Sequence, residues 1–202
     1  MKTKSVIFLD HDGVMCLHDE SGGRFKKWKE NPEMSGVFKD GRIRMNVNQI
    51  KTIPIGIRFD SFNQKAVKVL NRILEKTDAE IVVTSDWRHH TTLEEMQELY
   101  KLYGIIKSPI GLTPFAKDLE NGFEYAFMPD RYRLEISRCA EINHWLSENP
   151  QTKWVAIDDL DLSFDTWENW KFGLKNFVHT PRLLEGIKQS GKAEKVIKFL
   201  AE

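Results

Sequence analysis

Residues 5–15 read "SVIFLDHDGVM", an apolar run that ends abruptly in two aspartates one residue apart. The continuous apolar run at residues 6–9 is typical of a strand that is buried on both faces. Asp10 and Asp12 follow directly. Like charges crowded at the edge of a core are costly unless a cation or a reacting group compensates them. We therefore expect a functional site where this strand ends.

Three further segments show the pattern of buried strands, and helical patterns alternate with them. The predicted strands are "AEIVVTSDWR" at 79–88, "KWVAIDDLD" at 153–161 and "KNFVHT" at 175–180. Apolar residues at helical spacing predict helices over 60–77, 91–104 and 133–147, with one or two more after residue 181, broken near Gly186 and Gly191. Capping boxes are expected from Ser61 with Gln64 and from Thr92 with Glu95, and Gly104 is expected to stop the second helix.

Strands that alternate with helices predict an α/β fold with a parallel sheet covered on both faces. A chain of 202 residues suits one such domain, spanning 1–202. Two segments, 14–58 and 105–132, do not follow the alternation. We expect them to be small insertions over one end of the sheet rather than separate domains.

Composition limits the classes of protein that the chain can represent. Hydrophobic residues make up 41% and charged residues 30%, which predicts a packed core. The formal net charge is zero, so no global field attracts the protein to nucleic acid or membrane. Two cysteines are too few for a disulfide framework, and no apolar run is long enough for a signal peptide or a membrane span. The expected location is the cytoplasm.

Polar residues follow three of the predicted strands, and parallel strands place their carboxyl ends at one edge of a sheet. These residues are Asp10, Asp12, Thr84, Ser85, Asp158 and Asp159. Hard oxygen ligands of this kind suit Mg²⁺. One carboxylate can attack phosphorus, a second acid can protonate the leaving oxygen and later activate water, and hydroxyls can hold the phosphoryl oxygens.

The segments "FLDHDGV", "IVVTSDWR" and "VAIDDLD" resemble the first, second and fourth motifs of the haloacid dehalogenase (HAD) superfamily of phosphohydrolases. The resemblance implies a three-layer αβα, Rossmann-like fold with small cap insertions. "TSDWR", "GLTPF" at 111–115 and "RCAEINHWL" at 138–146 further resemble the branch associated with nucleic-acid repair proteins. An aspartate at position 12 implies phosphatase or phosphomutase chemistry within this superfamily.

The resemblance also implies a role for each site residue. Asp10 would be the nucleophile, and Asp12 the general acid/base whose main-chain carbonyl also binds the metal. Asp158 would complete the Mg²⁺ site begun by Asp10, with Asp159 in support. Thr84 or Ser85 would hold the phosphate. The cation of the third motif is assigned to Arg138, with Arg131 and Arg133 as competitors.

The segment 14–58 carries nine Lys/Arg against five Asp/Glu, and it contains "GRFKKWKE" at 23–30, which mixes cations with aromatic residues. This pattern favours an anionic substrate larger than one phosphate. We therefore expect a Mg²⁺-dependent phosphomonoesterase that acts on a nucleotide or a nucleic-acid terminal phosphate. The alternatives are an inactive HAD module that binds nucleic-acid ends, a phosphatase of small sugar phosphates, and an all-helical metal phosphohydrolase in which "HD" at 11–12 binds metal.

Each of these motifs also has a purely structural interpretation. The first aspartate pair would then begin a turn, the second pair would cap a helix, and the two hydroxyls would be ordinary strand-end residues. His89 and His90 are expected to be exposed or to cap a helix, because no cysteine or further histidine stands at ligand spacing. Trp87 and Trp145 are expected in the core.

Overall fold

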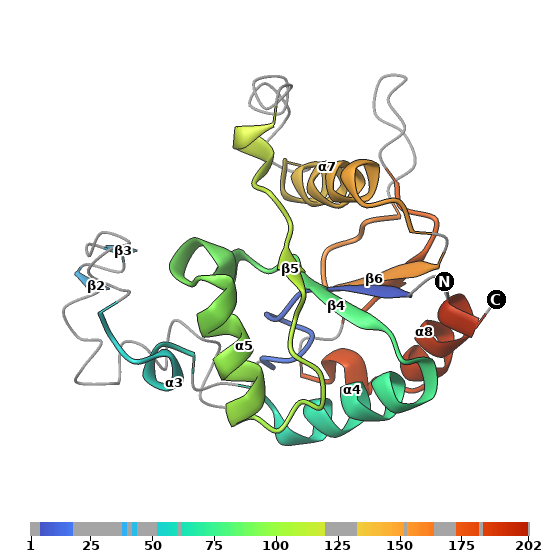
Figure 1. The fold of residues 1–202 in the computed structure, drawn as a ribbon, viewed down its shortest axis with the longest axis horizontal. Coiled ribbons are helices and arrows are strands. Elements are labelled where there is room, and N and C mark those ends of the chain that lie inside the picture. The colour runs from blue at the N-terminus through green and yellow to red at the C-terminus, as the bar shows by residue number, and fades with distance from the viewer. Residues whose placement is uncertain are drawn as a thin grey trace.

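The fold is built on a five-stranded parallel sheet with helices on both faces (Figure 1). The computed structural model describes residues 5–17, 38–39, 42–43, 52–59, 62–119, 133–151, 153–163, 173–181 and 184–201. The strands are β1 (Val6–Leu9), β4 (Glu80–Val83), β5 (Gly111–Leu112), β6 (Trp154–Asp158) and β7 (Phe177–His179), in the order β5-β4-β1-β6-β7. The predicted three-layer α/β architecture is confirmed.

Strand β1 occupies the centre of the sheet, between β4 and β6. Its four residues are all buried, and alternate side chains enter two different hydrophobic clusters. Ile7 and Leu9 pack with α4 (Gln64–Thr77), α5 (Leu93–Leu102) and α8 (Lys192–Ala201), whereas Val6 and Phe8 pack with α7 (Arg133–Glu148). A strand covered on both sides in this way needs the unbroken apolar run that the sequence shows.

The ends of two helices test the capping predictions. The capping box of Thr92 and Glu95 is present at the start of α5, and Gly104 follows that helix with a φ of +72°. The predicted start of α4 at Ser61 is wrong. The helix begins at Gln64, because the Asn63 side chain accepts hydrogen bonds from the next backbone N–H groups and acts as N-cap.

Two strands also differ from prediction. The predicted strand over 79–88 ends at Val83, and residues beyond it turn into the 3₁₀ helix η2 (Asp86–His90). Strand β5 lies in the segment 105–132, where no strand was predicted. It has only two residues, which pair with Val82 and Val83 of β4. A strand of two residues, one of them glycine, carries no periodic signal.

The structure describes only parts of the two predicted insertions. Within 14–58 these parts include the antiparallel pair β2 (Phe38–Lys39) and β3 (Arg42–Ile43) and the short helix α3 (Ile55–Arg58). Within 105–132, η3 (Ala116–Asp118) follows β5. The basic segment 23–30 lies outside the described residues, and the cap role of both insertions stays a prediction.

The C-terminal segment contains the 3₁₀ helix η5 (Gly186–Lys188) before α8, in agreement with a break at Gly186 and Gly191. Among the helices in the described parts of the chain, none combines the length and apolar character that crossing a bilayer requires.

Candidate active site

Three carboxylates meet where β1 and β6 end. The two strands pair in parallel with Leu9 opposite Ile157, and the backbone N–H of Asp10 donates to the Ile157 carbonyl at 3.0 Å. This register sets Asp10 beside Asp158 at the same edge of the sheet. Carboxylate oxygens of Asp10, Asp158 and Asp159 all lie within 4.8 Å of one another. The structure therefore brings together the two acidic motifs that are far apart in the sequence.

The guanidinium of Arg138 reaches this carboxylate cluster (Asp10, Asp158 and Asp159) from α7. Its Nη1 lies 2.6 Å from Asp158 Oδ2 and 3.1 Å from Asp10 Oδ1. Arg138 is buried, whereas Arg133 is exposed at the start of the same helix and Arg131 lies outside the described residues. Of the three candidate cations, the structure places Arg138 at the cluster.

Charge in the cluster is not balanced by Arg138 alone. Burial raises the pKa of Asp10, against the lowering effect of Arg138, and raises the pKa of Asp158 further above its ordinary value. Burial, followed by repulsion from Asp10, raises the pKa of Asp159 to about 7. Burial by itself would lower the pKa of Arg138, but the surrounding carboxylates raise it, so the guanidinium stays charged. One cation therefore faces three buried or half-buried carboxylates.

The donor set fits a divalent metal such as Mg²⁺. All three side chains offer hard carboxylate oxygens, and the excess negative charge is what a small dication would neutralise. Among the described residues, this is the one group of His, Cys, Asp and Glu side chains found with ligand atoms close enough to share an ion. His89 and His90 are not part of it, and both lie in the last turn of η2.

The turn after β1 is shaped to fit against the cluster. Gly13 adopts a φ of +71°, and a Cβ at this position would lie 2.6 Å from Asp159 Cγ. A side chain is therefore excluded here both by backbone strain and by contact with a cluster residue. The backbone N–H groups of Met15 and Cys16 donate to the His11 carbonyl, which closes the turn.

His11 points into the core rather than toward the cluster. Its side chain is fully buried, and Nε2 lies 2.9 Å from the Tyr100 hydroxyl. The ring also contacts Phe62 and Trp87 edge-on. Because His11 follows a parallel strand and has a phenol as partner, the all-helical "HD" metal interpretation is wrong.

Asp12 lies beside the cluster but does not join it. Its side chain is half-buried, and its Oδ2 accepts a hydrogen bond of 3.0 Å from the indole Nε1 of Trp87. Trp87 is fully buried and stacks on Phe59 at 4.3 Å and Phe62 at 5.2 Å between ring centroids. The predicted core position of Trp87 is confirmed. Its contact with Asp12 was not predicted, and it holds the carboxylate in one orientation.

The two consecutive hydroxyl residues after β4 have different partners. Thr84 Oγ1 accepts from Arg138 Nη1 at 3.5 Å, so this hydroxyl faces the cluster. Ser85 Oγ instead accepts from the backbone N–H of Trp87 at 3.4 Å and caps η2. Both side chains are buried. The sequence did not distinguish Thr84 from Ser85 as the phosphate ligand, whereas in the structure only the Thr84 hydroxyl contacts Arg138 and the Ser85 hydroxyl caps a helix.

A polar network around Arg138, buried except at Asp86, was not predicted. Glu141, three residues along α7, accepts from Arg88 Nη2 at 2.8 Å and from the backbone N–H of Ala116 at 3.0 Å. Asp86 Oδ1 accepts from Arg138 Nη2 at 3.3 Å. The one local signal was the spacing of Arg138 and Glu141, which places them on the same side of a helix.

Comparison with protein-family models matches residues 6–184 to the family described as "HAD domain in Swiss Army Knife RNA repair proteins". Comparison with curated proteins and with solved structures gave no match.

Proposed function

This chain belongs to the family of HAD domains in Swiss Army Knife RNA repair proteins, and from that premise we propose that it is a Mg²⁺-dependent phosphomonoesterase working through a phosphoaspartate at Asp10. The observation that carries the proposal is the meeting of Asp10, Asp158 and Asp159 within 4.8 Å of one another. The three carboxylates suit a dication, and the dication together with the Arg138 guanidinium suits the anionic oxygens of a phosphate ester.

The metal would be held by side-chain oxygens of Asp10, Asp158 and Asp159 together with the main-chain carbonyl of Asp12. When bound, Mg²⁺ neutralises the cluster and withdraws charge from a phosphoryl oxygen. Arg138 and the Thr84 hydroxyl lie next to the carboxylates and would bind the other non-bridging oxygens. The contact of Thr84 with Arg138 favours Thr84 over Ser85 for this role.

The chemical steps assign one bond change to each group. A carboxylate oxygen of Asp10 attacks phosphorus, and the bond between phosphorus and the ester oxygen breaks. Asp12 donates its proton to that leaving oxygen, while the Trp87 indole keeps the carboxyl group oriented. A water molecule then attacks phosphorus of the phosphoaspartate and gives its proton to Asp12. Inorganic phosphate leaves, and the Asp10 carboxylate is restored.

The substrate we propose is the terminal phosphate of a nucleic acid or a nucleotide. Support comes from the family description, which names RNA repair proteins. Further support comes from the excess of lysine and arginine in segment 14–58. A polymer end that must be dephosphorylated before rejoining is a substrate of this kind.

The deciding experiment measures Mg²⁺-dependent phosphate release from 5′- and 3′-phosphorylated oligonucleotides, nucleotides and sugar phosphates. Asp10→Asn should abolish release while the variant still folds and unfolds in one cooperative thermal transition. Asp161→Asn is the matched control, because this exposed carboxylate lies in the loop after β6 but outside the cluster. Acid quenching with ³²P-labelled substrate should trap a hydroxylamine-labile phosphoprotein in the wild type and none in Asp10→Asn.

Retained turnover in Asp10→Asn would refute the nucleophile. No release from any phosphomonoester, together with tight binding of phosphorylated oligonucleotides, would instead establish an inactive end-binding module. Faster release from sugar phosphates than from all nucleotides and oligonucleotides would overturn the nucleic-acid assignment while leaving the chemistry intact.

A further inference from the structure

A small pocket is lined by Arg138, whose guanidinium also contacts the carboxylate cluster. Its volume is about 210 Å³. We call it the stacking pocket and define it by Asp86, His89, Phe115, Lys117, Ser137 and Arg138, which come from η2, the segment around η3, and α7. Arg138 joins the two sites directly, because its Nη1 contacts Asp10 and its Nη2 contacts Asp86.

Two flat rings form one wall of the stacking pocket. The imidazole of His89 and the ring of Phe115 lie 4.1 Å apart between centroids, at an interplanar angle of 14°. Two cations stand over the Phe115 ring, with Arg88 Cζ at 4.8 Å and Lys117 Nζ at 5.6 Å from its centroid. Proteins that bind single-stranded nucleic acids combine aromatic rings, on which bases stack, with cations that contact the phosphate backbone.

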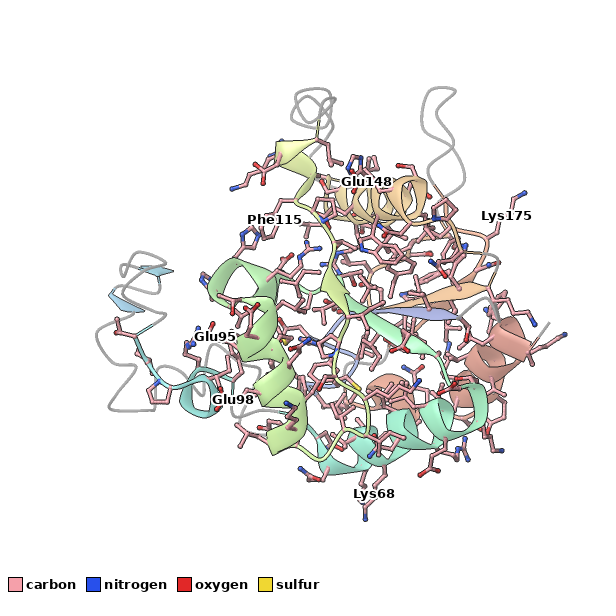
Figure 2. All side chains as sticks on the ribbon, in the orientation of Figure 1. Lys68, Glu95, Glu98, Phe115, Glu148 and Lys175 are labelled. Atoms are coloured by element: carbon pink, nitrogen blue, oxygen red, sulfur yellow. The ribbon has the colours of Figure 1, made fainter. Side chains whose placement is uncertain are left out.

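The stack is not part of the hydrophobic core. Phe115 belongs to neither of the two core clusters, and it is half-buried while His89 is exposed (Figure 2 labels Phe115, near α7). Its position is nevertheless fixed, because the N–H of the next residue, Ala116, is bound by Glu141, which also holds Arg88 in a buried ion pair. A rigid, partly exposed aromatic wall is pre-organised for a planar ligand.

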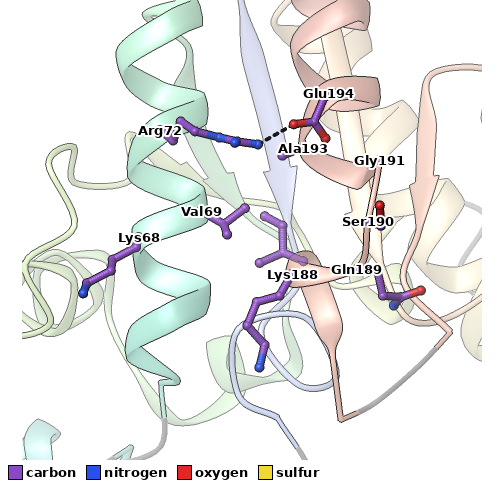
Figure 3. A pocket seen from close by; sticks show the side chains of 10 residues that line it. Lys68, Val69, Arg72, Lys188, Gln189, Ser190, Gly191, Ala193 and Glu194 are labelled. Carbon is purple, nitrogen blue, oxygen red and sulfur yellow. Dashed lines mark hydrogen bonds and ion pairs between the residues drawn. The ribbon is translucent and has the colours of Figure 1, made fainter.

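Size and location argue for one base rather than a larger ligand. Pockets that enclose drug-sized molecules measure about 300–1,000 Å³, so the stacking pocket suits a single ring system. A larger cavity of about 660 Å³ lies between α4 and α8 (Figure 3), where Arg72 is paired with Glu194. Another of about 450 Å³ lies between α3 and α5. Neither of these is lined by Arg138, the residue of the stacking pocket that contacts the carboxylate cluster.

We propose that the stacking pocket binds the base of the nucleotide that carries the reacting phosphate. The inference rests on the proposed function, because it assumes that the phosphate occupies the carboxylate cluster. The base stacks on the exposed imidazole of His89 and so extends the stack that Phe115 supports. Asp86 and Ser137 offer polar partners to its edge or to the sugar. Lys117 faces the next phosphate of the strand. A base already paired in a duplex end is not free to enter, so the preferred substrate is an unpaired end.

The test compares two single-stranded oligonucleotides that differ only at the phosphate-bearing nucleotide, one with a base and one with an abasic ribose. Both 5′- and 3′-phosphorylated pairs are used, and kcat/KM is measured for each. The wild type should prefer the substrate with the base. His89→Ala and Phe115→Leu should each reduce this preference about tenfold, the loss expected for one stacking contact. A blunt duplex with the same phosphate should react more slowly than the single strand.

His144→Ala is the matched control, since this histidine is part-exposed on α7, pairs with Glu148 and lies outside the pocket. It should leave the preference unchanged. Phe115→Leu is checked by thermal melting, and His89→Ala keeps the test valid if that variant is unstable. Equal losses for both substrates, no loss for either, or equal rates on the duplex and the single strand would overturn the proposal.

A wild-type protein that hydrolyses neither substrate would defeat the proposed function without deciding the pocket. Fluorescence anisotropy with the same pair of oligonucleotides then decides it. Tighter binding of the base-bearing strand, lost in His89→Ala and kept in His144→Ala, would support the pocket. Equal binding of the two strands would overturn it.

Discussion

Replacing Arg138 by methionine removes the cation of the cluster while keeping a side chain of similar length. All three side chains are buried, with exposed fractions of 6% for Arg138, 5% for Asp10 and 1% for Asp158. The substitution therefore leaves two carboxylates without their counterion and away from solvent. Removing one partner of a buried ion pair costs about 3–5 kcal/mol. For a chain of this size each kcal/mol lowers the melting temperature by about 2–4 °C, which predicts a fall of about 6–20 °C.

The pH dependence of this loss has a definite sign. Burial already raises the folded-state pKa of Asp10 and of Asp158, and loss of the guanidinium raises both further. An acid whose folded pKa lies above its unfolded value destabilises the fold increasingly as the pH rises from the unfolded pKa toward the folded one. The deficit of Arg138→Met should therefore be larger at pH 8 than at pH 5, where the carboxyl groups take up protons.

Differential scanning calorimetry in Mg²⁺-free buffer measures the effect, and adding Mg²⁺ should stabilise the variant more than the wild type. Arg72→Met is the control, because its ion pair with Glu194 has side chains 47% and 64% exposed. Such a surface pair contributes at most about 1 kcal/mol. The double variant Arg138→Met/Asp158→Asn should recover part of the loss. If Arg138→Met melted within about 2 °C of the wild type at pH 8, the counterion argument would be refuted.

Three other substitutions or treatments test separate parts of the structure. Trp87→Phe keeps an aromatic ring in the core but removes the N–H that orients Asp12, so kcat for phosphate release should fall about tenfold; the cavity left by the smaller ring should also lower the melting temperature. Gly13→Ala should lose about 1–3 kcal/mol of stability and also Mg²⁺ affinity by isothermal titration, because the new methyl group meets the cluster. Gly191→Ala has a similar φ with nothing within 4 Å, and it should show the backbone strain without the loss of Mg²⁺ affinity. Burial raises the pKa of the Cys139 thiol to about 12, so a disulfide reagent at pH 8 should modify it only after unfolding; modification of the native protein within minutes would contradict this.

Most of the architecture could be predicted because its signals are local. Strands β1, β4 and β6 each contain a continuous apolar run, which is typical of strands in a sheet that is covered on both faces. Strand β5 was not predicted because two residues are too few to show an alternation of apolar and polar side chains. Its pairing with β4 depends on the path of the chain after α5, which the sequence of the strand does not reveal. The N-cap Asn63 was missed because Ser61, two residues earlier, belongs to a residue type that caps helices equally well.

The site was predictable to the extent that it follows from topology. Asp10 and Asp158 end adjacent parallel strands, so the sheet alone brings them together. The pairing of Trp87 with Asp12 and the different partners of Thr84 and Ser85 depend on how η2 crosses the strand ends. The spacing of residues in the sequence does not reveal how η2 is oriented relative to the strand ends, so these contacts required the three-dimensional structure.

The central position of β1 has a consequence for biosynthesis. Val6 pairs with residue 80 of β4 on one side and with residue 154 of β6 on the other. The ribosome therefore synthesises β1 before either neighbour, and β6 after β4. On the ribosome, one edge of this apolar strand therefore stays unpaired until residue 154 has emerged. Synthesis thus passes through a period in which the nascent protein depends on chaperones or on transient collapse, and stalling before residue 154 should leave it prone to aggregation.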